Sequence, residues 1–402
     1  MLKRVLGILA WAVLSTGGSL SAAQWGILNG YKSDVDPKLH ATVVAAVATE
    51  TAVVVATQTP MAGPLISTVA GNGMYGYAGD NGPATSAEIS DPIGLAVDGS
   101  GNVYFTDNNT VYVAASLIRK VSPSGTMTTV AGSGVAGCNG DGGPATAANI
   151  CTSAGLAVDS ANAVYFADFN YCRVRKVDAS GNISTIAGNG LPGFAGDGGA
   201  ATLAALNYPY AVAVDSSFNV YVADKGNHRV RKISAGNIST YAGNGTSGYS
   251  GDGGYATLAE LANPAALAVD PSGNLYVGDS GCQCVRIVKV DGSIDTFAGN
   301  GNFGFSGDGG PATAAELSNP QSLAVDNEGV LYIADAINVR VRKVVGGDIY
   351  TVAGSGNSAY SGDGGPAVSA GMTAWAVGVH DLGGSVDLFI SDGTNYRIRK
   401  VH

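Results

Sequence analysis

The chain repeats one sequence unit of about 55 residues six times. A Gly–Asp step marks each copy, and successive steps are separated by 61, 56, 55, 56 and 55 residues. The six aspartates of this step are Asp80, Asp141, Asp197, Asp252, Asp308 and Asp363. A fixed period of this length indicates a repeat architecture in which each copy is one structural unit packed against its neighbours.

Each copy contains four short strand patterns separated by turn residues. In residues 296–344 these patterns are TFAG, SLAVD, VLYIAD and RVRKV, and NEGV supplies a hairpin turn between the second and the third. The 60 glycines and the low share of charged residues, 13%, fit many short strands joined by tight turns. Because four-stranded units of this kind close into rings of four to eight blades, we predict an all-β fold, a six-bladed β-propeller of four-stranded blades.

The best-preserved copy resembles the NHL-repeat family of β-propellers. YVADKGNHRVRKI, residues 221–233, carries the Asp, the Asn and the Arg-x-Arg-Lys strand of the family's blade signature. The TVAGNG and GDGGPAT segments are similar to exported bacterial NHL proteins and to the NHL module of teneurins. The resemblance covers residues 66–402 and implies a propeller over nearly the whole chain.

The order of the strands predicts how the ring closes. The repeat starts with a TVAG strand at residues 66–71 and ends with RIRKV at 397–401, so the sixth blade lacks its outermost strand at the C-terminus. We expect the N-terminal strand to complete that blade, which would leave no open edge between the first and the last blade.

The residues before the repeat have the features of an export signal. Lys3 and Arg4 precede the apolar run VLGILAWAVL, and small residues in SLSAAQ offer a cleavage site. An N-terminal membrane anchor is the alternative, but the apolar run is short for a span. We therefore predict a signal peptide at 1–23, a linker or extension at 24–65 and the propeller at 66–402, in a secreted, periplasmic or cell-surface protein.

The charge of the mature chain excludes two classes of partner. Without residues 1–23 it has 19 basic and 31 acidic residues, a net charge of −12. Such a protein has no general attraction for nucleic acid or for anionic lipid. We expect no nucleic-acid partner and no membrane insertion after signal cleavage.

Residues that recur in every copy are interpreted as structural, because a single active site needs its residues once. An aspartate that ends the second strand is followed five residues later by an arginine, and we expect ion pairs that brace this loop. The predicted pairs are Asp168 with Arg173, Asp224 with Arg229, Asp335 with Arg340 and Asp392 with Arg397. The remaining charges of the Arg-Lys strand are expected on a solvated blade face.

The Gly-rich segment GFSGDGGPATAAEL, residues 304–317, looks like a ligand-binding loop but is interpreted as a connector. It lacks the Lys-Ser/Thr step of a phosphate-binding loop and the spaced acidic ligands of a calcium loop. We expect Pro311 to start a short helix through Leu317, with Phe305 packed on that helix.

Function is expected where the copies differ, on the face that bears both the Gly-rich loops and the Asp-to-Arg loops, called the top face here. Just before each inner strand one position varies freely among the blades, while the next is always small. The candidate binding residues at this position are Ile93, Tyr210, Gln321 and Trp375. The alternative is that Tyr210 and Trp375 only plug the central channel.

Some copies of the repeat differ from the others by cysteine replacements or by an insertion. The second copy has Cys138 and Cys151 where others have an aromatic residue and a serine, which predicts a disulfide bond between them in an exported protein. Cys282 and Cys284 could pair, bind a metal weakly or remain thiols, and Cys172 has no evident partner. The first copy carries an insertion within 108–116.

The sequence favours a scaffold over an enzyme. Of the four histidines, His228 and His380 lie within the repeat, at opposite ends of the blades, so a histidine-held catalytic zinc is not expected. No nucleophile–base set is evident. We therefore predict a protein or glycan partner on the top face, with no cofactor and no metal. The alternative is a metal-dependent lactonase or lyase of the propeller type.

Overall fold

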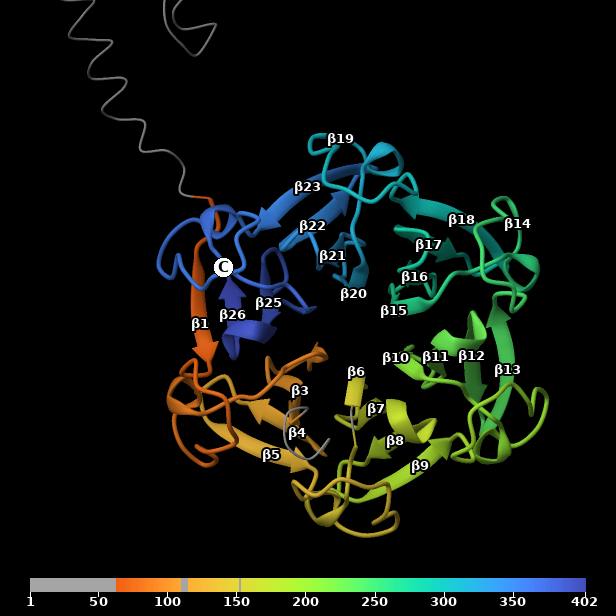
Figure 1. The fold of residues 1–402 in the computed structure, drawn as a ribbon, viewed down its shortest axis with the longest axis horizontal. Coiled ribbons are helices and arrows are strands. Elements are labelled where there is room, and N and C mark those ends of the chain that lie inside the picture. Colours follow the sequence, from red (N-terminus) through yellow and green to blue (C-terminus); the bar gives the residue numbers. More distant parts are fainter. Residues whose placement is uncertain (1–62, 110–114, 152) are drawn as a thin grey trace, which may run out of the picture. The chain divides into compact units, whose positions relative to one another are not determined.

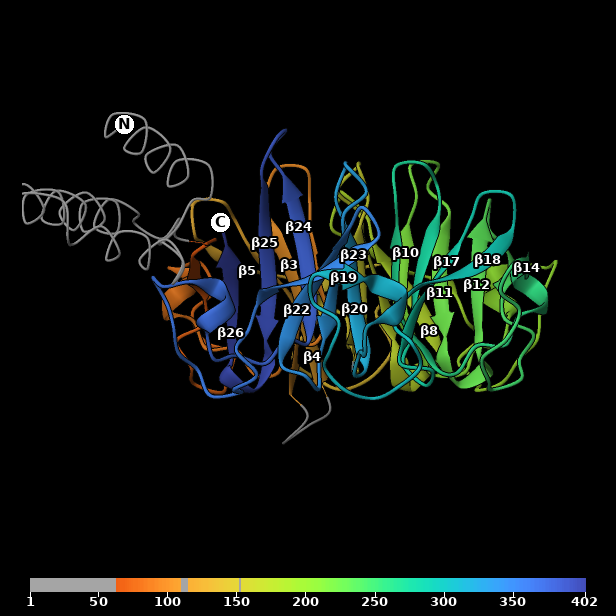
Figure 2. The ribbon, with the colours of Figure 1, turned by 90° about the horizontal axis from the view of Figure 1, so that it is seen from above.

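The computed structural model describes residues 63–109, 115–151 and 153–402. Contacts within the chain define one compact unit over Pro64–His402. Six antiparallel sheets are arranged around a common axis in this unit (Figure 1). Viewed edge-on, the strands run across the thickness of the ring (Figure 2). The predicted six-bladed β-propeller is confirmed.

Each blade has four strands in sequence order from the axis outward, except the last. Blade one contains β2 (Leu95–Val97), β3 (Val103–Asn109), β4 (Ala115–Val121) and β5 (Met127–Ala131). Blade two contains β6 (Ser153–Val158), β7 (Val164–Asp168), β8 (Arg173–Val177) and β9 (Ile183–Ala187). Blade three contains β10 (Pro209–Val214), β11 (Val220–Asp224), β12 (Arg229–Ser234) and β13 (Asn237–Ala242). Blade four contains β15 (Pro264–Val269), β16 (Leu275–Asp279), β17 (Cys284–Val288) and β18 (Ser293–Ala298). Blade five contains β20 (Pro320–Val325), β21 (Leu331–Asp335), β22 (Arg340–Val345) and β23 (Asp348–Ala353). Two-residue strands β14 (Gly254–Tyr255) and β19 (Gly310–Pro311) extend these two sheets.

The sixth blade is completed by the N-terminal strand, as predicted. It contains β24 (Ala376–Asp381), β25 (Val386–Asp392) and β26 (Arg397–Val401), and β1 (Ile66–Ala70) is its outer strand. Ile66 lies opposite Val401, and Leu65 and His402 exchange backbone hydrogen bonds of 3.0 and 3.1 Å. β1 therefore removes the free edge that β26 would otherwise present.

The described helices are single 3₁₀ turns. One lies in each Gly-rich loop: η1 (Ala84–Ser86), η2 (Ala145–Ala147), η4 (Ala201–Leu203), η6 (Ala256–Leu258), η7 (Ala312–Ala314) and η8 (Ala367–Ser369). Three more follow the second strand of a blade: η3 (Phe169–Tyr171), η5 (Lys225–Asn227) and η9 (Gly393–Asn395). None of the described helices is long and apolar enough to cross a membrane.

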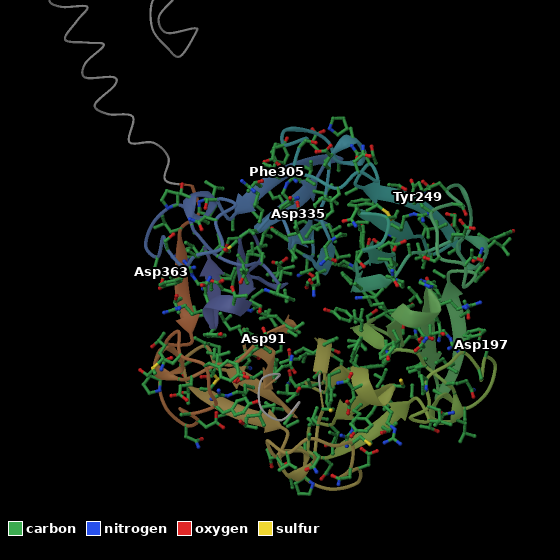
Figure 3. The ribbon with its side chains drawn as sticks, in the orientation of Figure 1. Asp91, Asp197, Tyr249, Phe305, Asp335 and Asp363 are labelled. Atoms are coloured by element: carbon green, nitrogen blue, oxygen red, sulfur yellow. A yellow bond between two sulfur atoms is a disulfide. The ribbon has the colours of Figure 1, made fainter. Side chains whose placement is uncertain are left out.

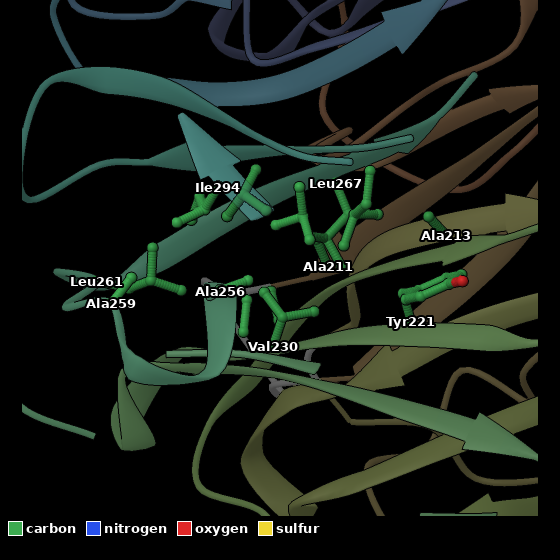
Figure 4. Packing of buried hydrophobic residues seen from close by; sticks show 14 residues of the cluster. Ala211, Ala213, Tyr221, Val230, Ala256, Ala259, Leu261, Leu267 and Ile294 are labelled. Atoms are coloured by element: carbon green, nitrogen blue, oxygen red, sulfur yellow. The ribbon is translucent and has the colours of Figure 1, made fainter. Parts of the chain in front are cut away.

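The Gly-rich loops seal the spaces between blades. In the cluster of Figure 4, Ala256, Ala259 and Leu261 of such a loop pack with Val230 of blade three and Ile294 of blade four. The connector interpretation therefore fits the packing. The predicted helix was too long, because only Ala312–Ala314 forms a 3₁₀ turn before the backbone becomes extended at the following residue.

The hairpins on the opposite face are capped as their composition suggests. The Asp215 carboxylate accepts N–H bonds of 2.9 and 2.8 Å from Ser217 and Asn219, which satisfies turn amides. Its second oxygen accepts the Tyr221 hydroxyl at 3.2 Å. The same Tyr–Asp contact recurs in the hairpins of the first five blades. These tyrosines thus join the second strand to the turn beside it.

Candidate functional site

A fully buried arginine lies at the centre of each blade's top-face loops. Its backbone is on the third strand, and its side chain has no exposed surface in any of the six blades. These residues are Arg119, Arg175, Arg231, Arg286, Arg342 and Arg399. The expectation that the charges of this strand face solvent was wrong for this arginine.

The buried arginine joins two carboxylates that lie far apart in the sequence. In blade three, Arg231 binds Asp197 of the Gly-rich loop through Nε at 3.1 Å and binds the strand-end Asp224 through Nη1 at 3.2 Å. Figure 3 shows Asp197 toward the outside of the ring. We call this arrangement the Asp–Arg–Asp cluster. Its loop aspartate is the residue that marks the repeat, so the Gly–Asp step serves to anchor the loop to the blade.

The four predicted ion pairs of the loops differ from the structure in which arginine each aspartate contacts. The four strand-end aspartates contact the buried arginine two residues further along, at 4.0, 3.2, 3.4 and 3.3 Å. The backbones do pair as expected, since each aspartate lies opposite the predicted arginine: Asp168 opposite Arg173, Asp224 opposite Arg229, Asp335 opposite Arg340 and Asp392 opposite Arg397. Cross-strand neighbours at the end of a hairpin need not join side chains, and here the second arginine points inward.

The first arginine of the motif instead covers the loop surface. Arg340 donates to the carbonyl oxygens of Asn338 and Ser355 at 2.9 Å each, and the Phe305 ring lies 3.9 Å from its guanidinium carbon. Phe305 thus stacks on an arginine and not, as predicted, on a helix. Phe194 and Tyr360 occupy the same place beside Arg229 and Arg397. These contacts are cation–π interactions on the outer side of the cluster.

Burial dominates the electrostatics of the strand-end aspartates. Desolvation raises the pKa of Asp107 and of Asp168 to about 7, and the neighbouring arginines oppose this shift. It raises the pKa of Asp335 to about 6. A buried carboxylate of this kind is tolerable only beside its arginine, because a lone buried charge is strongly unfavourable. The cluster is therefore a structural device and not a free acid–base pair.

The candidate binding residues at the axis come together only in part. Ile93, Tyr210 and Gln321 line one cavity with the small residues of the inner strands, and the Tyr210 hydroxyl accepts a 2.5 Å hydrogen bond from the Gln321 amide. This bond joins blades three and five across the axis. Trp375 lies instead against Gly393 of its own blade. The cavity that these residues line is small, about 40 Å³, with room for about one water molecule.

Aromatic residues that sequence reasoning missed extend this group over the top face. Phe169 lies 5.0 Å from the Tyr208 ring and 5.8 Å from the Tyr210 ring, and the Lys225 ammonium lies 4.1 Å from the Tyr210 ring. Tyr208 is 49% exposed. We call Phe169, Tyr208, Tyr210, Lys225 and Gln321 the mouth patch. Phe169 and Lys225 share one loop position that differs in every blade, and this variation was the available sequence signal.

Tyr208 has an unusual backbone. Its φ is +50°, in the left-handed region, where blades four and five have Asn263 and Asn319. Asparagine tolerates this conformation far better than tyrosine does. Tyr208 therefore carries a local conformational cost that Asn263 and Asn319 largely avoid.

A carboxylate also lies near the mouth. Asp91 lies toward the centre of the ring in Figure 3, and burial raises its pKa. It acts electrostatically on Tyr210, whose own pKa is raised chiefly by burial. The mouth thus offers opposite charges, Lys225 and Asp91, beside aromatic surface.

The cysteines differ from the prediction. The disulfide bond among the described residues joins Cys282 and Cys284, with their Cα atoms 5.3 Å apart. Cys138 is a thiol, so the predicted bond between Cys138 and Cys151 is not formed in the structure. Replacement of two residues in one loop was not sufficient grounds for a bond. The insertion of blade one lies partly outside the described residues, and its last described pair is Asn109 with Ala115.

Two family models match the chain. The model described as "Teneurin NHL domain" matches residues 302–370, and the model described as "NHL repeat" matches residues 206–233. The second range includes all of residues 221–233, the segment that carried the resemblance in the sequence.

The curated relatives are much longer proteins. Teneurin-1 of Gallus gallus is 33% identical over 286 residues, which are 62% of this chain and 10% of the relative. Teneurin-1 of Homo sapiens is 29% identical over 389 residues, 84% of this chain and 13% of the relative. The chain thus spans about a tenth of the length of the teneurins it matches.

Two solved structures from Bacteroides thetaiotaomicron share the fold. One, a structural genomics protein of unknown function, has a TM-score of 0.60 and 19% identity, covering 84% of this chain and 75% of its own. The other, an auxiliary nutrient binding protein, has a TM-score of 0.62 and 14% identity over 85% and 77% of the two chains. The six sheets make this chain a six-bladed β-propeller, and the repeated blade motif and both family models show that it contains NHL-type repeats and is similar to the NHL domain of the teneurins.

Proposed function

We propose that this propeller is an exported interaction scaffold that binds a protein over the mouth patch of its top face. The observation that carries the proposal is the gathering of unrepeated side chains at one place. The Phe169 ring contacts the rings of both Tyr208 and Tyr210 there, although the surrounding loops follow one repeated pattern. A variable patch on a rigid frame is typical of a recognition surface.

The chemistry of the patch suits a partner that lies on the surface. The cavity that Tyr210 lines is too small to admit more than about one water molecule, so a ligand has to cover the mouth. Tyrosine provides large, rigid contact area with a polar end and is enriched among residues that dominate binding energy. Lys225 and Gln321 add a positive charge and an amide at the same place.

Support for export comes from the N-terminal sequence and the cysteines. The signal-like residues 1–23 lie outside the described residues. A disulfide bond such as Cys282–Cys284 is typical of oxidising compartments. Cell fractionation with N-terminal sequencing of the mature protein tests this part. A chain that retains Met1 in the soluble cytosolic fraction would contradict it.

The mouth patch does not support the alternative function, a metal-dependent lactonase or lyase. Among the residues that the structure describes, the grouping of three side chains able to hold a metal lies in blade four and contains two cysteines. The mouth patch itself offers no such grouping within the described chain.

The experiment is affinity capture with the full chain as bait, identified by mass spectrometry, and a glycan array as a parallel arm. Wild type is compared with the double variant Tyr208→Ala/Tyr210→Ala and with Tyr255→Ala, which removes a tyrosine that is 70% exposed in the Gly-rich loop entering blade four. Melting temperatures establish that all three are folded. We expect a protein captured by wild type and by Tyr255→Ala but lost by the double variant.

Two outcomes would contradict the proposal. If the double variant captures the same partner equally well, the patch is not the site. If it loses stability but no partner, Tyr210 serves only to plug the channel. Binding confined to the glycan array would move the function to carbohydrate recognition at the same face.

A further inference from the structure

The top-face loop of blade four departs from the repeat at two positions that contact each other. Blade three has Asn227 and Arg229 after its strand-end aspartate, whereas blade four has Cys282 and Cys284. Both cysteines are buried, with 8% and 1% of their surface exposed. The outer half of the Asp–Arg–Asp cluster is kept, because Arg286 still binds Asp252 of the Gly-rich loop.

These two replacements change the surroundings of the strand-end aspartate. In blade three, Asp224 is held by the Asn227 amide at 2.8 Å and by Arg231 at 3.2 Å. In blade four, the Asp279 carboxylate accepts the Ala262 N–H, at 2.9 and 2.8 Å to its two oxygens, and lies within 4.8 Å of both cysteine sulfurs. The asparagine side chain has been exchanged for thiol chemistry facing a buried carboxylate.

The loop between the cysteines is fixed in place. Gln283 has a φ of +54°, its amide donates to the Ser280 carbonyl at 2.6 Å, and its side-chain oxygen accepts the Asn319 N–H at 2.6 Å. The two sulfurs are therefore presented from a turn pinned to the next blade. A preformed arrangement of this kind reduces the cost of ordering the side chains around a ligand.

A disulfide bond at this spacing contributes little to the stability of the fold. A crosslink stabilises a protein mainly by restricting the unfolded chain, and the effect is smallest for short loops. The loop closed by Cys282 and Cys284 contains one residue, Gln283. The pair is therefore better explained by chemistry than by stapling.

We propose that, in the dithiol state, Asp279, Cys282 and Cys284 form a binding site for a thiophilic divalent cation such as Zn²⁺, and that the disulfide is the oxidised, metal-free state of the same site. Thiolate sulfur and carboxylate oxygen are established zinc ligands, and three protein ligands leave a fourth position for water or another donor. This site is independent of the proposed function, because none of the five residues of the mouth patch comes from blade four's loop.

A dithiol reductant converts the disulfide state of this site into the dithiol state. One thiolate of the reductant attacks a sulfur of the pair and breaks the Cys282–Cys284 bond, which gives a mixed disulfide. The second thiolate of the reductant then attacks that mixed disulfide and leaves as a cyclic disulfide, so two electrons pass to the cysteines, which take up two protons. Metal binding releases those protons, because only thiolates coordinate the ion.

The surface beside Gly301 is less covered than the equivalent surface in two other blades. In blades three and five the equivalent glycines, Gly245 and Gly356, are covered by the guanidinium groups of Arg229 and Arg340. At Gly301 no side-chain atom lies within 4 Å of the position that a Cβ would take. With Cys284 in place of the arginine, the surface at Gly301 is therefore not covered by a side chain of this loop.

The test uses the full chain, reduced with dithiothreitol, desalted without oxygen and titrated with Cd²⁺ as a spectroscopic probe, with Zn²⁺ in competition. We expect one ion per chain, a thiolate-to-metal charge-transfer absorption and no binding to the oxidised protein. The double variant Cys282→Ser/Cys284→Ser should lose the absorption, and the matched control Cys138→Ser should keep it. Asp279→Asn should keep the absorption but lower the affinity at least about tenfold.

A second readout avoids dependence on the folding of the variants. In reduced wild type, bound Cd²⁺ should protect Cys282 and Cys284 from alkylation, as mapped by mass spectrometry. Reduced wild type that binds no ion would overturn the proposal. So would an ion that the double serine variant still binds, or protection that falls on Cys138 and Cys172 instead.

Discussion

Arg231 and Tyr210 belong to the same blade but to two regions built on opposite principles. Arg231 is the centre of an Asp–Arg–Asp cluster whose arginine and loop aspartate are present in all six blades. Tyr210 occupies a position whose residue type varies from blade to blade. The conspicuous, repeated charges of this chain hold loops in place, whereas the unrepeated positions are free to differ from blade to blade.

Removal of β1 should produce the largest effect, because it damages the frame on which both regions depend. A chain lacking residues 60–71 loses the strand that pairs with β26 and the buried Ile66 and Ala70. We expect the melting temperature to fall further than for any point variant, with exposure of the β26 edge and aggregation. Thermal unfolding with light scattering measures this. An unchanged melting temperature would show that the ring closes without β1.

The next effect should separate the two arginines of one strand. Arg231→Ala leaves Asp224 buried without its ion pair, which should lower the free energy of unfolding by about 3–5 kcal/mol. Arg229→Ala removes a half-buried arginine that contacts Asn227, Asn244 and the Phe194 ring, and should cost about 1 kcal/mol. Denaturant unfolding of the two variants makes the comparison. Equal losses of unfolding free energy would mean that the buried arginine of the cluster stabilises the fold no more than Arg229 does.

The frame should also be sensitive to alkaline pH through its tyrosines. Burial, together with Asp270, raises the pKa of Tyr276 to about 12 from an ordinary value of 10.0. The folded state thus retains a proton that the unfolded state loses, so stability falls as pH rises above 10 through about 12. Tyr104 and Tyr332 act in the same direction, each with a pKa of about 12.

Tyr276→Phe should flatten this pH dependence. At neutral pH the variant should lose about 1 kcal/mol with the hydrogen bond to Asp270, and the difference from wild type should shrink above pH 10. Urea unfolding at a series of pH values is the measurement. A wild type whose stability does not change between pH 9 and 11 would contradict the shifted values.

The fold was predictable from the sequence because each part of it is repeated. The six copies of the Gly–Asp step define the blades, and the order of TVAG and RIRKV defines the closure at Ile66 and Val401. Repetition also suggested that the strand-end aspartates have arginine partners, and they do lie beside buried arginines. It did not show which arginine each aspartate contacts, since two arginines alternate on one strand and only packing decides that Arg231 points inward.

The candidate site was predictable only in part, for a physical reason. Tyr210 and Gln321 were found because a single register of the inner strand brings them to the axis. Phe169 and Tyr208 come from two different loops, and their contact depends on the left-handed backbone at Tyr208. Such a contact has no periodic signature. The cysteines show the same limitation. The sequence predicted a bond between Cys138 and Cys151, whereas the bond in the structure joins Cys282 and Cys284, which are separated by one residue.

The smallest effect on stability is expected at Tyr208, where the two principles meet in one residue. Tyr208→Asn installs the residue that blades four and five have at the equivalent positions, Asn263 and Asn319. It relieves the cost of tyrosine in the left-handed region but loses the ring contact with Phe169. Because each of these terms is of order 1 kcal/mol, the free energy of unfolding should stay within about 1 kcal/mol of wild type.

Binding should respond differently to the same substitution. Tyr208 provides half-exposed aromatic surface at the centre of the mouth patch, so Tyr208→Asn should weaken capture of the top-face partner at least about tenfold. Affinity is measured by surface plasmon resonance and stability by urea unfolding, on the same preparations. Loss of both together would assign Tyr208 to the frame, whereas loss of binding alone shows that blade three retains a strained tyrosine for its partner, where two other blades have the relaxed asparagine.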